Sequence, residues 1–219
     1  MTTFEKLLLE RDGFRCVGSK TPSLNKGGLK ENKKIPSALT TGTHILPMTV
    51  LDYKAKDAGS CASTWHIVRN YGAFTEDMVK NLDNIIDTPE NGMTLTTSLQ
   101  GTFDAFFWCL LPKGNDDRVW RTHLLTSCLM EGLLDEVVFE DVMASVPIQR
   151  KRRPNGIPLP NATFIRFHAA IAHVAHLSGA GEFVDEYIQK YEELDPGLPN
   201  GDIFIEYLVG YHSPSEASI

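Results

Sequence analysis

Four polar side chains that follow one another along the chain have the types and order needed for chemistry: His44, Asn91, Gln100 and Asp104. His44 lies in the run THILP, Asn91 in DTPENG, and the last two in LQGTFD. A histidine at the end of a strand can deprotonate water, and an asparagine in the following turn can orient the imidazole by hydrogen bonding. Ligands on the next helix can hold a metal ion that stabilises a leaving oxyanion. The order therefore indicates a general base beside a metal site.

The elements that must position these residues follow from periodicity and turn residues. The apolar run at 43–50 suits a short strand, residues 75–86 suit a helix, and the proline and glycine of 87–92 predict a turn around Asn91. Apolar residues then recur at spacings of four, three and four, which predicts a helix that Pro112 ends. This stripe consists of Leu99, Phe103, Phe106 and Leu110.

The remaining segments predict an α+β chain. We expect helices at 4–10 and 63–72, strands at 15–17, 118–125 and 136–142, and a loop or flap at 18–38. A C-terminal helix is indicated by the stripe Phe164, Phe167, Ile171 and Val174. We expect one domain over residues 1–219, with a core at 13–112, a strand and helix extension at 118–195 and a flexible tail at 212–219.

Composition restricts the class of protein. The apolar fraction is 42% and the charged fraction 22%, which is ordinary for a soluble globular chain. The longest apolar run is too short to span a bilayer, and no export signal precedes it, so we expect a cytoplasmic protein without a membrane partner. The net charge of −7 argues against nucleic acid as a partner. Four widely spaced cysteines form no CxxC pair and are expected to be reduced and mostly buried.

The segments RCVGSK, HILP, NG and LxxFD together resemble the HNH nuclease family, and in particular its fungal HNH-like proteins. In that group a similar strand precedes AHILP, a tryptophan-bearing helix and NGxxL…LHxxFD. The segment from Leu159, LPNATFIRFHAAIAHVAHLSGAGEF, is similar to the C-terminal helical part of these proteins. The resemblance implies an HNH-like ββα core with a long insertion and a C-terminal helical segment.

The same resemblance assigns roles to individual residues. It implies that His44 is the general base, Asn91 the residue that orients it, and Asp104 the acidic residue of the helix. Gln100 stands where the family has a histidine, and a neutral amide oxygen is a poor substitute for imidazole on a transition metal. Thr43, the residue before His44, is also a weak ligand. We therefore expect no metal and no other cofactor.

The other histidines offer weak compensation. His168 falls on the apolar stripe of the C-terminal helix, which favours a core histidine over a ligand. His173 and His176 are three residues apart and could chelate a metal, but no carboxylate has matching spacing. His66 is expected to be partly exposed on its helix, and His123 belongs to no pattern.

Loss of the metal ligands leaves three functions open. The first is a pseudo-nuclease whose former metal cleft binds a small hydrophobic substrate such as a terpenoid, because the chain is similar to the branch that contains the norbornene-forming Diels–Alderase of sordaricin-type diterpene biosynthesis. A pericyclase needs only an apolar cleft and a few hydrogen-bonding groups. The expected polar groups are His44, Asn91, Gln100, Arg69 and Asp104, with Trp65 and Trp108 as walls. The alternatives are a metal-dependent HNH endonuclease and a non-catalytic binding protein. His44 and Asn91 could equally be retained for the fold alone.

Overall fold

The computed structural model describes residues 2–24, 36–46, 74–126, 130, 132–146, 153 and 155–177. Within these ranges the chain is a mixed α+β fold with two antiparallel sheets. The predicted helix at 63–72, which carries Trp65, His66 and Arg69, lies outside the described residues, as do the predicted tail at 212–219 and residues 25–35 of the predicted loop.

The first sheet is a two-stranded ribbon formed by residues far apart in the chain. β1 (Thr40–His44) pairs antiparallel with β2 (Gly92–Thr96), so that His44 lies opposite Gly92. α6 (Thr97–Asp104) follows β2 directly, because the Thr96 hydroxyl accepts a hydrogen bond from the Leu99 amide and caps the helix. α6 packs against both strands of the ribbon. The strand β2 was not predicted, because the sequence indicated a turn at 87–92 followed directly by a helix.

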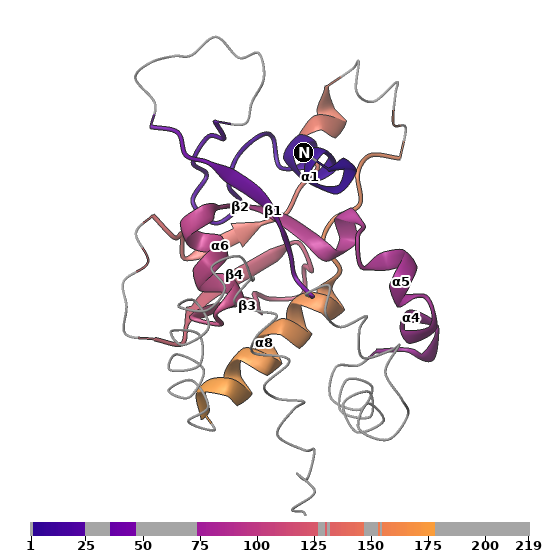
Figure 1. Ribbon diagram of the computed structural model, residues 1–219, viewed down its shortest axis with the longest axis vertical. Coiled ribbons are helices and arrows are strands. Elements are labelled where there is room, and N and C mark those ends of the chain that lie inside the picture. The colour runs from indigo at the N-terminus through magenta and orange to yellow at the C-terminus, as the bar shows by residue number, and fades with distance from the viewer. Residues whose placement is uncertain are drawn as a thin grey trace, which may run out of the picture.

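α1 (Thr3–Arg11) packs on the ribbon as well, and it confirms the helix predicted at 4–10. Its start is fixed by a reciprocal capping box between Thr2 and Glu5. The buried side chains Phe4 and Leu8 approach the ribbon closely at its glycines. Figure 1 shows α1 above the ribbon and α8, in orange, below β3 and β4.

The second sheet has the order β3-β4-β5, with all neighbours antiparallel. Its strands are β3 (Trp108–Pro112), β4 (Val119–Leu124) and β5 (Glu136–Val138). They confirm the strands predicted at 118–125 and 136–142, although β5 is shorter and is followed by the 3-10 turn η3 (Val142–Ser145). α8 (Ala162–Leu177), the predicted C-terminal helix, packs against β3.

The single helix predicted over the stripe Leu99 to Leu110 and ended by Pro112 is wrong. The chain is helical only over α6; Phe106 has a positive φ of 59°, and β3 begins at Trp108. Trp108, Cys109 and Leu110 are all buried, so both sides of this strand are covered. A strand buried on both sides is a continuous apolar run, and such a run also satisfies helical spacing.

Smaller differences affect single elements. The predicted strand at 15–17 is reduced to an isolated bridge between Arg15 and Pro22. The helix predicted at 75–86 is divided into α4 (Glu76–Lys80) and α5 (Leu82–Ile85), followed by the 3-10 turn η2 (Pro89–Asn91). On α8, Val174 is 59% exposed instead of ending the buried stripe. The buried face turns toward Ala172 and Ala175, whose small side chains let the helix approach β3 and its neighbours.

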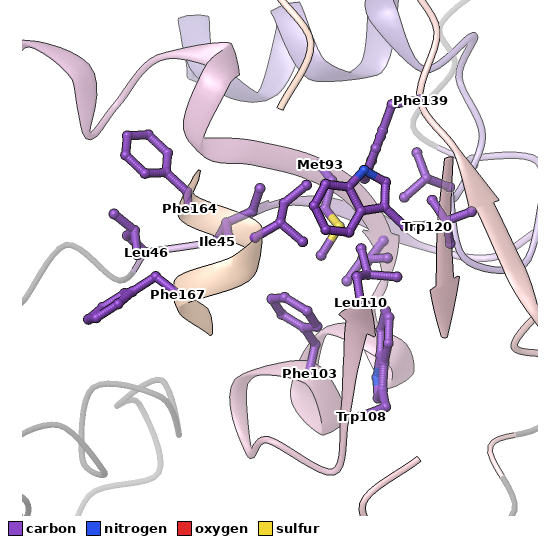
Figure 2. Close-up of a cluster of buried hydrophobic side chains, with 14 of the residues drawn as sticks. Ile45, Leu46, Met93, Phe103, Trp108, Leu110, Trp120, Phe139, Phe164 and Phe167 are labelled. Carbon is purple, nitrogen blue, oxygen red and sulfur yellow. The ribbon is translucent and has the colours of Figure 1, made fainter. Parts of the chain in front are cut away.

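One hydrophobic cluster joins the ribbon, α6, the second sheet and α8. Figure 2 shows its side chains from all of these elements meeting in one region. Trp108 and Trp120 are the largest fully buried members. The aromatic and aliphatic residues labelled there are Ile45, Leu46, Met93, Phe103, Trp108, Leu110, Trp120, Phe139, Phe164 and Phe167.

Candidate functional site

His44 lies at the end of β1 and is held on two sides. Its ring stacks on Phe4 of α1 with centroids 4.1 Å apart and an interplanar angle of 6°. Its Nε2 lies 3.1 Å from Oδ1 of Asp87. The His44 side chain is 25% exposed and that of Asp87 59%. The imidazole is therefore fixed in orientation while one part of it reaches the surface.

The sequence predicted that Asn91 orients His44 by a direct hydrogen bond. In the structure the Asn91 side chain binds backbone groups of other residues instead. Its Nδ2 donates to the carbonyl oxygens of Leu46 (2.9 Å) and Ile86 (2.8 Å), and its Oδ1 accepts from the Leu46 amide (2.8 Å). Both side-chain N–H groups are thus occupied by backbone, and the residue is completely buried. Asp87, which was not predicted, is the residue that contacts the imidazole.

The two faces of the ribbon carry different predicted residues. His44 is paired with Gly92, where an added Cβ would lie 2.4 Å from the Phe4 ring, so both point to the α1 face. Thr43 is paired with Met93, which packs with Leu99 and other α6 residues in the core. Because successive residues of a strand point to opposite faces, Thr43 and His44 cannot serve one cluster on the same face.

Gln100 and Asp104 lie on α6, four residues apart and both half-buried. They are neighbours on one side of this helix, whose packing surface belongs to the face of Thr43 and not to that of His44. The structure thus brings together His44, Asp87 and the backbone around Asn91. It leaves Gln100 and Asp104 on the other side of the ribbon.

Trp108 is a core residue and not a wall of a cleft. It is fully buried, and its Nε1 donates to the Leu99 carbonyl oxygen (3.3 Å) and to the Thr102 hydroxyl (3.1 Å). Its ring also packs on Phe103 at 4.9 Å. Trp65 and Arg69, the other predicted substrate-binding residues, lie outside the described residues.

The described residues at the predicted site do not form a binding site for a catalytic metal ion. Among the described residues, no group of three or more His, Cys, Asp or Glu side chains is placed to hold one. The Thr43 hydroxyl is buried without a hydrogen-bond partner in the same described set, and the core around it is apolar. Threonine and glutamine oxygens are poor ligands for transition metals.

Arg11 and Asp12 form a buried ion pair that also binds the backbone on either side of Asn91. Arg11 donates to both carboxylate oxygens of Asp12, and also to the carbonyl oxygens of Pro89 (2.7 Å), Gly92 (2.8 Å) and Pro158 (3.2 Å). Asp12 Oδ2 also accepts from the Thr94 amide. This ion pair was not predicted, because a buried arginine has no signal in periodicity.

The histidines of α8 are structural in the described part of the chain. His168 stacks on Phe103 at 3.8 Å, its Nε2 lies 3.3 Å from the Phe103 carbonyl oxygen, and burial lowers its pKa to about 3. This confirms the predicted core histidine. His176 donates to the Phe106 carbonyl oxygen, and His173 donates to that of Ala169.

His123 stacks on His173 with centroids 5.2 Å apart and nearly parallel planes. Burial, the charge of His173 and the charge of Arg121 together lower the pKa of His123. Parallel rings direct their in-plane lone pairs along separate planes, so this pair does not form a chelating site.

The two cysteines in the described ranges, Cys16 and Cys109, are free and buried, as expected. Burial raises the pKa of the Cys109 thiol to about 12, which makes it a poor nucleophile. Cys61 and Cys128 lie outside the described residues.

A cavity of about 510 Å³ lies apart from the predicted site residues. Its volume is in the range of small-molecule sites. The carboxylate of Asp141 in its wall is occupied by the amides of Ala144 and Ile157. The lining residues are Asp141, Ala144, Arg153, Asn155, Gly156, Ile157, Pro158 and Leu159.

Comparison with protein-family models, with curated proteins and with solved structures gives no match for this chain. Within the described residues, none of the helices combines the length and the apolar character needed to cross a membrane.

Proposed function

We propose that this protein is a metal-independent pericyclase, with an HNH-like fold, that catalyses an intramolecular Diels–Alder cyclisation of a hydrophobic polyene of fungal secondary metabolism. The observation that carries the proposal is the division of the ribbon. The face that presents Thr43 toward α6 is filled by apolar side chains, whereas His44 on the other face is fixed by Phe4 and Asp87 and stays partly exposed.

A cycloaddition makes few chemical demands on a protein. Two carbon–carbon σ bonds form as three π bonds become one, so no nucleophile, redox partner or metal is required. The protein must hold the diene and the alkene in contact in a reactive conformation. In this proposal His44, whose ring is supported by Phe4, contacts the substrate and helps to hold it in that conformation.

The experiment uses the purified full chain, treated with chelator, and a synthetic cyclopentadiene tethered to an α,β-unsaturated aldehyde as the probe. Norbornene formation and its stereochemical ratio are measured against the uncatalysed reaction. We expect acceleration that is insensitive to chelator and about tenfold slower in His44→Ala, the equivalent of about 1.4 kcal/mol. Leu159→Trp, in the wall of the separate cavity, is the control for binding there. If Leu159→Trp loses activity and His44→Ala retains it, the active site is that cavity and not the surface around His44.

Plasmid cleavage in the presence of magnesium, manganese or zinc ions tests the competing endonuclease. We expect no cleavage by the wild type and none by Gln100→His, because the added imidazole on α6 lies on the other side of the ribbon from His44. Metal-dependent cleavage by the wild type that His44→Ala abolishes would overturn the proposal. Failure of the probe reaction together with failure of cleavage would leave the non-catalytic binding protein as the better assignment.

A further inference from the structure

Asn91 joins the chain segments that carry His44 and Asp87, although its side chain forms hydrogen bonds with neither of those side chains. Through its side chain it binds both backbone groups of Leu46, two residues after His44. The same side chain binds the carbonyl oxygen of Ile86, immediately before Asp87. Its backbone carbonyl also accepts from the Ile45 amide at 2.9 Å. One buried amide therefore fixes the separation of these two segments.

The contact that results selects one nitrogen of His44. A carboxylate can only accept a hydrogen bond, so Nε2 carries the proton that it donates to Asp87. In the neutral ring, the proton-free nitrogen is then Nδ1. Within the described residues Nδ1 has no hydrogen-bond partner, and the side chain is a quarter exposed.

The hydrogen bond from His44 to Asp87 needs support from elsewhere. Because the Asp87 carboxylate is more than half exposed, water and salt weaken the pair, and an isolated exposed pair contributes little. Two fixed supports compensate: the Phe4 ring beneath the imidazole and the backbone clamp of Asn91. Gly92 is needed for the first support, since a side chain there would occupy the place of the Phe4 ring.

We propose that Asn91 is a positioning residue that acts through Asp87, and that Asp87 sets the tautomer of His44 so that Nδ1 is the nitrogen that meets the substrate. The statement that Nδ1 meets the substrate rests on the pericyclase proposal. The tautomer and the role of Asn91 do not. The active group is thus a histidine, a carboxylate and a remote amide, whereas direct contact between histidine and asparagine was expected from the sequence.

The test is nuclear magnetic resonance of the full chain labelled with ¹⁵N histidine, at about pH 8, where imidazoles are neutral. In the wild type we expect His44 to be protonated at Nε2. In Asp87→Ala the ratio of the Nε2–H to the Nδ1–H tautomer should fall about threefold, as for a part-exposed pair. The matched control is Asp83→Ala, on α5 close in sequence, which should leave the ratio unchanged. Equal ratios in the wild type and in Asp87→Ala would overturn the proposal.

Asn91 is tested without a substitution that could unfold the protein. Its side-chain amide protons and the Leu46 amide proton should exchange with water slowly in the wild type, because all are buried and hydrogen-bonded. Exchange of these protons should remain slow in Asp87→Ala, because the hydrogen bonds of Asn91 do not involve the Asp87 carboxylate. Rapid exchange of the Asn91 amide in the wild type would contradict the clamp.

Cyclisation of the probe gives a separate readout. Asp87→Ala should lower kcat about threefold with little change in KM, because the carboxylate contacts the imidazole and not the substrate. A change in the tautomer without any cyclisation in the wild type would leave the positioning assignment intact and reject the pericyclase. A change in KM alone, with the tautomer unaltered, would reject the positioning role.

Discussion

The two faces of the β1–β2 ribbon differ in what covers them. On one face, Thr43 and Met93 are buried against α6 in the main hydrophobic cluster. On the other, Gly42 and Gly92 let α1 approach, and His44 at the end of the strand keeps a quarter of its surface exposed. Adjacent residues of one strand can therefore have different environments. Thr43 is buried in the core, whereas His44 lies at the surface in a fixed orientation.

The supports of the two faces differ as well. The α6 face is held by apolar packing alone. On the α1 face, the apolar side chains Phe4 and Leu8 are supplemented by buried polar groups, namely Arg11, Asp12 and Asn91. Apolar packing tolerates substitution by similar volumes, but a buried charge that loses its partner does not. The α1 face should therefore be the more sensitive of the two to single substitutions.

The largest effect is expected from Arg11→Met. The substitution leaves the buried Asp12 carboxylate without its guanidinium partner and three carbonyl oxygens without their donor. Breaking a buried pair in this way costs about 3–5 kcal/mol of unfolding free energy. Urea unfolding followed by circular dichroism measures the loss. Arg118→Met, which breaks the exposed pair with Asp116, is the control and should leave the unfolding midpoint almost unchanged. Equal midpoints for the two variants would contradict the buried support.

Gly92→Ala tests how closely α1 approaches the ribbon. The added Cβ would lie 2.4 Å from Phe4 and 2.7 Å from Leu8, so the helix must shift, at a cost of about 1–3 kcal/mol. The extended backbone of Gly92 itself accepts alanine, so the effect is steric. Gly101→Ala on α6 is the matched control, because nothing lies within 4 Å of its added Cβ and alanine favours a helix by about 0.5–1 kcal/mol. Thermal unfolding should thus move in opposite directions for the two variants. A gain for Gly92→Ala would show that α1 does not press on the ribbon.

Local elements were predictable from the sequence, whereas the contacts between distant segments were not. α1, β4 and α8 follow from capping residues and periodicity that act within a few residues. His44 was predicted as a site residue, but its partner Asp87 lies 43 positions away, and no pattern connects a strand end with an exposed carboxylate in a turn. The change from helix to strand after Asp104 was missed because burial on both sides of β3 removes the alternation that identifies a strand.

His168 gives the α6 face a dependence on pH. Burial lowers its pKa from 6.5 to about 3, so below pH 6.5 the unfolded chain binds a proton that the folded chain does not. The contribution of His168 to stability is therefore complete above that pH and is lost as the pH falls toward 3, by about 1 kcal/mol between about pH 6 and 5. The difference in unfolding free energy between the wild type and His168→Gln, which retains a donor for the Phe103 carbonyl and does not titrate, isolates this contribution. A difference that is constant over this range would contradict the neutral, buried imidazole.

The smallest effect compares one threonine on each face. The hydroxyls of Thr43 and Thr94 are both buried without a hydrogen-bond partner among the described residues. Thr43 points to α6, whereas Thr94, opposite Gly42, points to the α1 face. Valine has the same shape without the unsatisfied hydroxyl, so each Thr→Val substitution should raise the unfolding free energy by about 1 kcal/mol, as measured by urea unfolding. A gain for Thr94→Val with a loss for Thr43→Val would mean that the Thr43 hydroxyl has a polar partner. The α6 face would then not be a closed apolar surface, and the main argument against a ligand site there would fail.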